Sequence, residues 1–246
     1  NTEGGFGGGI GYHSHLAATY SSILSLIILD DKESINKIDK IQMKNFFVSL
    51  KGDVKGSYRI HINGEIDLRC TFIVILVSKY LNILDEELID GVIEYIKNCQ
   101  TYEGGIGPRP NVEAHGGYTF CGVATLSLLN SLNVINIKKL TYWLNCMQTE
   151  FGGFCGRTNK LVDSCYSFWQ GASFYIIKNF YNKGENFKIE NHLLNDISFN
   201  EKELSKYILT ACQSFKGGFC DKPTKKVDLY HSMYSLSGLS LCCEEE

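Results

Sequence analysis

The sequence has little proline, little net charge and no long apolar run. Three prolines in 246 residues argue against a disordered chain, because disordered segments are enriched in proline. A net charge of −3 and the lack of a lysine/arginine block give no electrostatic basis for binding nucleic acid or a membrane surface. The richest apolar stretch, residues 72–77, is far shorter than the roughly 20 residues of a transmembrane helix. With 44% hydrophobic residues, the composition favours a single folded domain over residues 1–246.

Cysteine is abundant, but its pattern does not favour disulfides. No secretory signal precedes the ten cysteines, and Cys99, Cys146 and Cys212 lie within helical patterns, near their carboxyl ends. We interpret the cysteines as thiols and expect a reducing, cytoplasmic location. The chain begins inside a repeat and ends shortly after the polar loop of the last one, so we expect it to be a fragment or the product of a shortened gene model.

Glycine is frequent, and it recurs in a repeated pattern. Five glycine-rich turns are each followed by a polar loop and an apolar segment, and a histidine or aspartate comes eleven residues after the first glycine of each turn. Because equivalent positions of a repeat protein superpose, we expect these polar side chains to lie on a shared rim that forms an active site. The turns begin at Gly4, Gly56, Gly104, Gly152 and Gly217, and the polar residues are His15, Asp67, His115, Asp163 and Asp228.

The spacing of the turns changes near the carboxyl end. Gly56, Gly104 and Gly152 follow one another at intervals of 48 residues, whereas Gly152 and Gly217 are 65 residues apart. The additional segment, about residues 181–200, is rich in Asn, Lys and Glu. It is predicted to be a surface insertion.

Two kinds of helix are predicted between the turns. The segment before a turn has apolar residues at i, i+3, i+4 and i+7, as in Val92, Tyr95, Ile96 and Cys99, which is typical of a helix with one buried face. The segment after the rim residue is apolar nearly all round, as in residues 72–77, and must be buried on both faces. Strands could explain such short runs, but the regular repeat favours helices. Outer amphipathic helices around inner buried ones predict an all-α fold, an α/α toroid that encloses a funnel.

Three residues of the rim are potential zinc ligands. Asp163, Cys165 and His231 offer a carboxylate, a thiolate and an imidazole, and the repeat register allows them to approach one another. Three protein ligands leave the fourth tetrahedral position open, which is the pattern of a catalytic zinc site. Zinc in such a site can hold a substrate thiol as thiolate at neutral pH. The alternative is a buried structural thiol beside a capping or core histidine.

The rest of the rim is basic and aromatic. His115, Arg157, Lys160 and Tyr166 offer hydrogen-bond donors suited to a phosphate or diphosphate, with Lys225 near His231 in its loop, although a solvated loop would also explain Arg157 and Lys160. Aromatic residues follow just inside the rim and would line a funnel for a long apolar chain with an anionic head, unless they are ordinary core. These aromatic residues are Tyr20, Phe72, Tyr118, Phe120, Phe168 and Trp169.

Several long motifs resemble the protein farnesyltransferase β-subunit family. They are Gly-Gly-Phe-Gly-Gly-Gly at 4–9, His-Leu-Ala-x-Thr-Tyr at 15–20, Glu-Ala-His-Gly-Gly-Tyr-Thr-Phe-Cys-Gly at 113–122, Asn-Lys-Leu-Val-Asp-x-Cys-Tyr-Ser-Phe-Trp-Gln at 159–170 and Asp-Lys-Pro at 221–223. The likeness runs from Gly4 to about Leu239. It implies an α/α barrel that works as a heterodimer with a helical-repeat α subunit, and transfer of a farnesyl group from farnesyl diphosphate to the cysteine of a C-terminal C-a-a-X protein.

The resemblance also implies roles for single residues. Asp163, Cys165 and His231 would bind Zn²⁺, and Asp221 would help to bind Mg²⁺. Tyr166 and Lys160, with His115 and Arg157, would hold the diphosphate at the reacting centre. The remaining residues would line the isoprenoid and peptide sites: Arg69, Tyr118, Cys121, Trp169 and Tyr20 for the isoprenoid, Tyr230 on the peptide side, and Tyr234 at the deep end of the funnel.

The sequence departs from the family pattern in a few places. Phe72 stands where the family usually has tyrosine, Ser164 where it usually has glycine, and Gly52 where a glutamine precedes the later turns. The amino-terminal helices that complete the barrel and the closing carboxyl-terminal helix are absent, so the predicted toroid is incomplete.

Three alternatives to a farnesyltransferase stay open. The β subunit of geranylgeranyltransferase type I shares the barrel, the zinc site and the diphosphate rim. A non-catalytic α/α toroid would be a binding module and would not need three ligands in register. A terpene cyclase toroid needs an acidic motif and no zinc.

Overall fold

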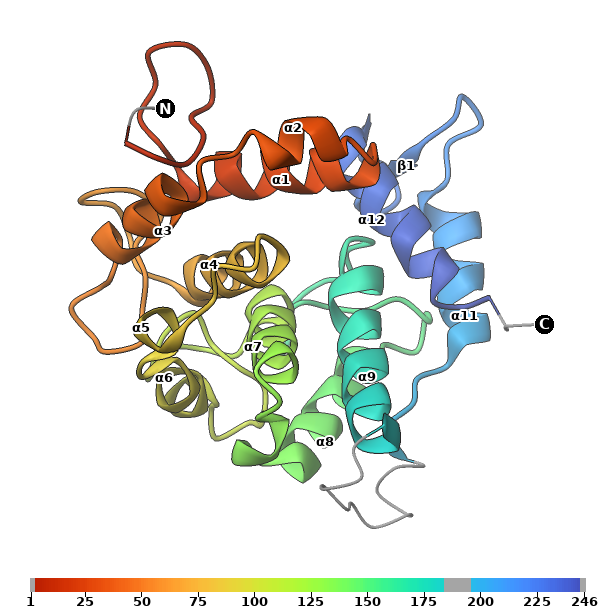
Figure 1. Cartoon of the computed structure of the whole chain (residues 1–246). Coiled ribbons are helices and arrows are strands. Elements are labelled where there is room, and N and C mark those ends of the chain that lie inside the picture. Colours follow the sequence, from red (N-terminus) through yellow and green to blue (C-terminus); the bar gives the residue numbers. More distant parts are fainter. Residues whose placement is uncertain (1–2, 184–195, 244–246) are drawn as a thin grey trace. The chain divides into compact units, whose positions relative to one another are not determined.

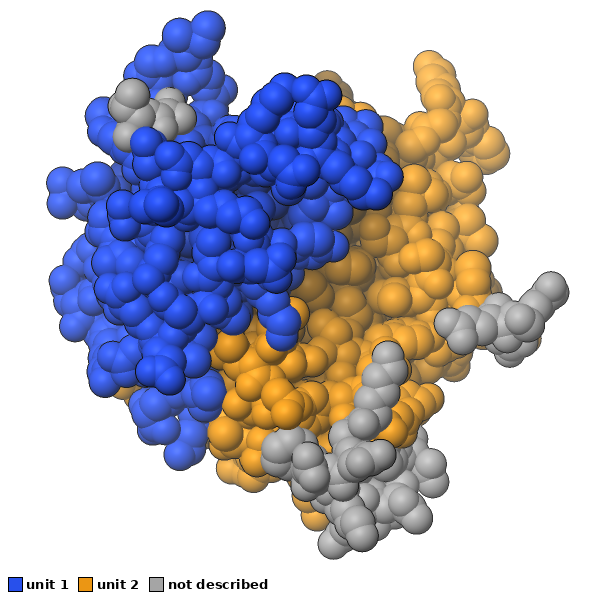
Figure 2. All heavy atoms as spheres, in the orientation of Figure 1, with its two compact units in different colours: residues 1–98 blue, residues 99–246 orange. Residues whose placement is uncertain are grey.

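The computed structural model describes residues 3–183 and 196–243, in two compact units. Unit 1 comprises Asn1–Asn98 and unit 2 comprises Cys99–Glu246 (Figure 2). The single domain expected from the composition stays a prediction. In the part of the chain that is described, no helix combines the length and the hydropathy that crossing a bilayer requires. The ten cysteines, all of them described, are thiols.

Unit 1 is built from short helices around α4. Helix α1 packs against α2 and α4, and α5 packs against α3 and α4 (Figure 1). The inner helix α4 is buried along most of its length, as its continuous apolar sequence predicts. The helices are α1 (Leu16–Ile28), α2 (Lys32–Asn36), α3 (Lys40–Ser49), α4 (Leu68–Tyr80), α5 (Glu86–Ile89) and α6 (Val92–Cys99).

Unit 2 places helix α9 between α7 and α12. A two-stranded antiparallel ribbon, in which Phe219 pairs with Asp228, leads from the last glycine turn into α12. One turn of π-helix, η2, ends α11 and was not predicted. The elements are α7 (Gly116–Leu128), η1 (Leu132–Val134), α8 (Ile137–Met147), α9 (Tyr166–Lys183), α11 (Glu201–Tyr207), η2 (Ile208–Cys212), β1 (Phe219–Cys220), β2 (Val227–Asp228) and α12 (Leu229–Ser240) (Figure 1).

Four of the five turns need glycine because the backbone of the next outer segment lies against Gly4, Gly56, Gly104 and Gly152, whereas a Cβ on Gly217 would meet nothing within 4 Å. Gly152 has a φ of +90°, and a Cβ there would lie 2.2 Å from the carbonyl oxygen of Glu203 in α11. The preceding Gln148 fixes the same contact, because its Nε2 donates to the carbonyls of Gly152 (2.8 Å) and Asn200 (2.9 Å). Gly52 replaces this glutamine in the second turn, where a Cβ would lie 2.3 Å from Ser57 Oγ.

The five rim residues share a local structural role. His15, Asp67, His115 and Asp228 are N-caps, and each accepts a hydrogen bond from a backbone N–H in the first turn of the following helix. Asp163 accepts one in the same way from the N–H of Cys165. An N-cap side chain satisfies a donor that the helix itself leaves unpaired. Helix capping therefore accounts for the eleven-residue spacing. A chemical role for any of these side chains depends on the further contacts that it makes.

The expected insertion at about 181–200 lies partly outside the described residues, which omit 184–195. Its first residues, 181–183, belong to α9. Its last part contacts the core, because Ile197 is buried and the ring of Phe199 lies 5.3 Å from that of Phe174. Asn200 is the N-cap of α11.

Candidate active site

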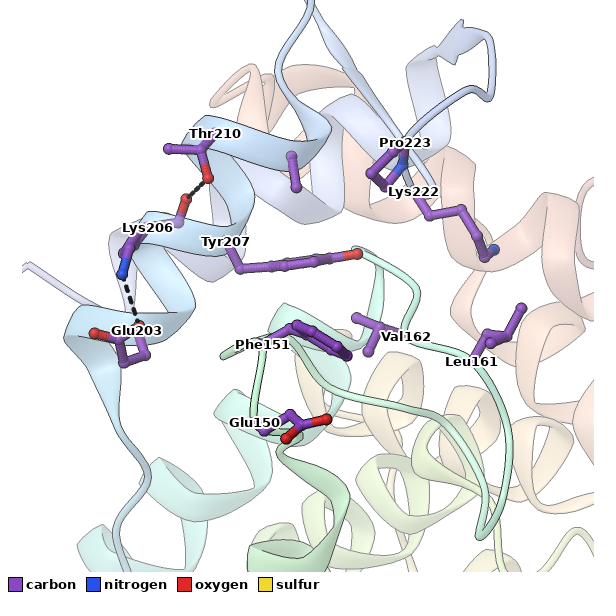
Figure 3. A pocket seen from close by; sticks show the side chains of 11 residues that line it. Glu150, Phe151, Leu161, Val162, Glu203, Lys206, Tyr207, Thr210, Lys222 and Pro223 are labelled. Carbon is purple, nitrogen blue, oxygen red and sulfur yellow. Dashed lines mark hydrogen bonds and ion pairs between the residues drawn. The ribbon is translucent and has the colours of Figure 1, made fainter.

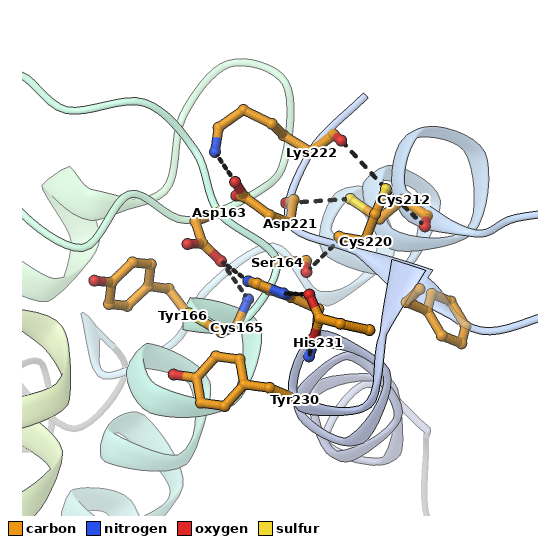
Figure 4. Close-up of polar contacts among 12 residues, drawn as sticks. Asp163, Ser164, Cys165, Tyr166, Cys212, Cys220, Asp221, Lys222, Tyr230 and His231 are labelled. Atoms are coloured by element: carbon orange, nitrogen blue, oxygen red, sulfur yellow. Dashed lines mark hydrogen bonds and ion pairs between the residues drawn. The ribbon is translucent and has the colours of Figure 1, made fainter. Parts of the chain in front are cut away.

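Unit 2 brings Asp163, Cys165 and His231 together (Figure 4). One ligand atom from each residue lies within 4.8 Å of the other two. His231 Nε2 is 3.4 Å from Asp163 Oδ1. Asp163 and Cys165 come from the loop that enters α9, and His231 comes from the first turn of α12. The packing of α12 on α9 therefore closes the cluster.

Asp228 determines which nitrogen of His231 faces the cluster. Its Oδ2 lies 2.6 Å from His231 Nδ1, and its Oδ1 accepts the backbone N–H of His231 at 2.8 Å. These bonds hold the pKa of Asp228 below its usual value, so the carboxylate is an acceptor and Nδ1 carries a proton. In the neutral ring the Nε2 lone pair then points at the Asp163 carboxylate. Two electron-rich atoms facing each other at 3.4 Å fit a bound cation, and a carboxylate behind a ligating histidine is the usual support.

The thiol of Cys165 completes a donor set suited to zinc. Cys165 is 4% exposed, and burial, with the negative charge of Asp163 beside it, raises the pKa of its thiol. A divalent cation reverses this effect, because it stabilises the thiolate. A carboxylate, a thiolate and an imidazole match the ligands of open zinc sites.

His115 and Tyr166 form a second pair in unit 2. His115 Nδ1 accepts the N–H of Gly117 at 3.1 Å, so the neutral ring carries its proton on Nε2. That nitrogen lies 3.0 Å from Tyr166 Oη and donates to it. The phenol proton of Tyr166 is left to donate elsewhere. Burial raises the pKa of Tyr166, so the hydroxyl keeps this proton.

Two glycines that were not predicted as site residues, Gly116 and Gly156, leave room for the ring of Tyr166. A Cβ on Gly156 would lie 1.9 Å from Tyr166 Cζ, and a Cβ on Gly116 would lie 2.9 Å from Tyr166 Cδ1. The backbone N–H of Gly116 also donates to the carbonyl of Gly156 at 2.8 Å. No pattern in the sequence indicated this slot, because it forms between segments 40 residues apart.

The two basic residues predicted at this rim are placed differently. Arg157 Nη1 lies 3.1 Å from Glu113 Oε2, and the positive charge of Arg157 acts on the Tyr166 hydroxyl. Lys160 is exposed, and its backbone N–H donates to the carbonyl of Arg157. Arg157 thus lies beside the His115–Tyr166 pair, whereas the Lys160 side chain extends into solvent.

A chain of aromatic rings leads away from His231. The ring of Tyr230 is 5.1 Å from that of His231 and 4.7 Å from that of Tyr234. Tyr234 is 4.5 Å from Trp169, whose Nε1 donates to Tyr230 Oη at 3.4 Å. The chain continues from Trp169 to Phe120 at 5.1 Å. On the other side, Tyr118 lies 5.3 Å from His115, and Cys121 is buried in α7. The rings of Tyr230, Tyr234, Trp169 and Phe120 therefore form one continuous cluster from α12 through α9 to α7.

The predicted site residues of unit 1 form their own contacts. Arg69 is bound to the carboxylate of Asp67, with its Nε 3.1 Å from both oxygens. The ring of Tyr20 lies 6.2 Å from that of Phe72.

Asp221 lies at the end of β1, beside the zinc-ligand loop. Its carbonyl accepts the N–H of Ser164 at 2.8 Å, and Ser164 Oγ donates to the carbonyl of Cys220 at 2.8 Å. The hydroxyl of Ser164 thus adds a second bond between the loop and the strand. The side chain of Asp221 contacts Lys222 Nζ through Oδ2, whereas its buried Oδ1 has no hydrogen-bond partner among the described residues. An unpartnered carboxylate oxygen fits a Mg²⁺ ligand.

Comparison with known proteins identifies relatives over the whole chain. The model of the prenyltransferase alpha-alpha toroid domain matches residues 1–246. The β subunit of protein farnesyltransferase from Schizosaccharomyces pombe is 42% identical over 97% of this chain and 61% of its own length. The β subunit of geranylgeranyl transferase type 1 from Arabidopsis thaliana is 32% identical over 94% of this chain and 60% of its own length.

A solved structure gives the same result for the fold. Protein geranylgeranyltransferase-I of Candida albicans, complexed with GGPP, superposes with a TM-score of 0.73 at 25% identity, over 93% of this chain and 67% of the other. The all-α, α/α toroid fold expected from the repeats is confirmed, and so is the resemblance to farnesyltransferase β subunits. The chain spans about 60% of the length of the two curated relatives.

Proposed function

Because this chain belongs to the prenyltransferase α/α toroid family, we propose that it is the catalytic part of a zinc-dependent protein farnesyltransferase β subunit. Its partner would be an α subunit, and its substrates would be farnesyl diphosphate and a C-a-a-X protein or peptide. The observation that carries the proposal is the cluster of Asp163, Cys165 and His231, in which Asp228 binds Nδ1 of His231 and Nε2 faces the Asp163 carboxylate. We also expect the cytoplasmic location that the cysteines suggested.

Two groups of residues in this chain would serve the reaction, one that binds zinc and the substrate thiol and one that binds the diphosphate. Asp163, Cys165 and His231 would hold Zn²⁺, which when bound supplies a Lewis acid that keeps the substrate thiol deprotonated. His115 donates from Nε2 to Tyr166, which orients the phenol so that its own proton can be donated to a diphosphate oxygen. Arg157, and Lys160 after a change of rotamer, would add positive charge where negative charge develops on the leaving group. The aromatic surface from Tyr230 to Phe120 would exclude water from the isoprenoid.

The proposal is tested by transfer from each lipid donor. The full-length chain, co-expressed with an α subunit, is incubated with a C-a-a-X peptide and either farnesyl or geranylgeranyl diphosphate. Mass spectrometry should detect a farnesyl thioether on the peptide cysteine, and none on a matched peptide with serine in its place. No transfer from either donor would favour the binding-module alternative. Preferential transfer from the C20 donor would favour the geranylgeranyl enzyme, to which the C20-lipid complex of the structural relative also points.

Tyr234 is expected to select the shorter lipid. Its ring lies 4.5 Å from Trp169 and 5.6 Å from Phe168, and a close-packed floor cannot take another isoprene unit without strain. Tyr234→Ala should shift the ratio of kcat/KM for the C15 and C20 donors toward C20 by about tenfold, since such overpacking costs roughly 1–3 kcal/mol. Phe215→Ala, at a fully exposed ring, is the control. Equal use of both donors by the unmodified enzyme would contradict the assignment to Tyr234.

Gly156→Ala is expected to weaken the binding of diphosphate. The new Cβ would overlap the ring of Tyr166, so the hydroxyl must leave its place beside His115. Losing one hydrogen bond to a charged group should weaken binding of inorganic diphosphate by about tenfold, as measured by calorimetry. Gly8→Ala is the matched control, because a Cβ there meets nothing within 4 Å. Unchanged affinity in Gly156→Ala would remove Tyr166 from the site.

A further inference from the structure

A cavity of about 610 Å³ lies in unit 2, outside the cluster of Asp163, Cys165 and His231. Its volume falls within the range of small-molecule sites. Two of its walls are loops that continue into the candidate active site, since Val162 precedes Asp163 and Lys222 follows Asp221. The cavity is lined by Glu150, Phe151, Leu161, Val162, Glu203, Lys206, Tyr207, Thr210, Ala211, Lys222 and Pro223 (Figure 3).

The preceding repeat has polar bridges at the positions that correspond to the cavity wall. There Thr158 Oγ1 donates to Glu103 Oε2 at 2.6 Å, and Arg157 Nη1 lies 3.1 Å from Glu113 Oε2. The corresponding residues of the next repeat cannot form these bridges, because three of the four have apolar side chains. By the 48- and 65-residue offsets of the turns, Glu103, Glu113, Arg157 and Thr158 correspond to Phe151, Leu161, Lys222 and Pro223. Both polar bridges are therefore missing from the repeat that forms the cavity.

Two aromatic rings shape the cavity. Tyr207 is 9% exposed and is held by α11, whereas Phe151 is 68% exposed and stands at the mouth. Figure 3 shows the two rings one above the other, with Leu161 and Val162 beside them. An apolar or cationic group placed between two ring faces gains both buried area and electrostatic attraction to the rings.

The charges around the cavity favour a cation. Lys206 Nζ lies 3.3 Å from Glu203 Oε2, and Lys222 contacts Asp221. These two lysines are therefore compensated. Within residues 3–183 and 196–243, no ion pair of Glu150 is present, so its carboxylate is the remaining charge on the cavity wall.

From these observations we infer that the cavity is a binding site for a small organic cation with an aromatic body. Its ring would lie between Phe151 and Tyr207, and its ammonium or guanidinium group would face Glu150. The ligand would contact the loops that carry Asp163 and Asp221 without touching either side chain. This inference does not depend on the proposed prenyl transfer.

The test compares three probes with the same ring: benzyltrimethylammonium, benzyl alcohol and phenylacetate. Binding to the full chain is measured by saturation-transfer NMR titration. The cation should bind about two- to fivefold more tightly than the alcohol, as expected for an exposed ion pair with Glu150, and phenylacetate should bind most weakly. Glu150→Gln should remove the preference for the cation.

Variants of Phe151 and Phe215 locate the site. Phe151→Ala should weaken binding of benzyltrimethylammonium about fivefold, because one of the two aromatic rings that stack on the ligand is lost. Phe215→Ala should leave it unchanged, since Phe215 is fully exposed and outside the cavity. Equal binding of the three probes, or the same affinity in Phe151→Ala as in the unmodified chain, would overturn the inference. Circular dichroism confirms that both variants are folded.

Discussion

Cys165→Ala is expected to lose the zinc that we propose for the unmodified protein. One Zn²⁺ per chain should fall to nearly none, because two of the three ligands cannot hold the metal at a site built for three. Prenyl transfer to the peptide thiol should fall at least about a hundredfold, whereas binding of farnesyl diphosphate should persist, since the His115–Tyr166 pair does not depend on Cys165 for its hydrogen bond. Metal analysis of the purified protein and calorimetry with the lipid measure the two effects separately.

Cys146→Ala is the matched control for this experiment. Cys146 is exposed on α8 and is not part of the cluster, so its removal should change neither zinc content nor activity. Stoichiometric zinc in Cys165→Ala would show that the metal is bound elsewhere. Zinc loss together with equal loss of lipid binding would indicate a folding defect instead of a missing ligand.

Asp221→Lys is expected to remove the magnesium response that we propose for the enzyme. A hard Mg²⁺ binds one or two carboxylates together with phosphate oxygens, and it neutralises charge on a departing diphosphate. The unpartnered Oδ1 of Asp221 is suited to such a role, and Lys222 occupies the other oxygen. The turnover of the unmodified enzyme should rise roughly tenfold or more with Mg²⁺, since a metal ion supplies several kcal/mol of charge stabilisation. In the variant it should change little.

Zinc content and lipid affinity provide the second readout for Asp221→Lys. Both should stay near their original values, because Asp221 is outside the cluster of Asp163, Cys165 and His231. Asp53→Lys is the control, since that carboxylate is 83% exposed and belongs to unit 1. A magnesium response in Asp221→Lys equal to that of the unmodified enzyme would make Asp221 a turn residue, consistent with its position before Lys222-Pro223.

The local features of the repeat could be predicted from the sequence. The spacing of apolar residues marked the buried faces, as at Val92, Tyr95 and Ile96, which are nearly inaccessible. The eleven-residue offset marked the start of each inner helix, because a capping residue must stand just before the first turn. The same offset selected Asp163 and Asp228, and with them the neighbourhood of Cys165 and His231. These features depend on residues close together in the chain, so one sequence is enough to find them.

Other features were decided only by tertiary packing. The packing of α12 on α9 brings the ring of His231 to Asp163, and Gly116 and Gly156 leave room for the ring of Tyr166. The first of these contacts orients a ring toward a loop that precedes it by more than sixty residues. Arg157 pairs with Glu113, although its sequence context predicted a free rim cation.

The two kinds of feature differ in predictability because they depend on interactions over different separations in the sequence. Helix caps and apolar stripes are determined by the periodicity of the backbone, so residue type and spacing reveal them. A hydrogen bond such as that between His115 and Tyr166, 51 residues apart, forms only where packing brings two rings within about 3 Å. Sequence therefore determined which side chains stand at the starts of the helices, and packing of α9 against α7 and α12 decided which of them meet.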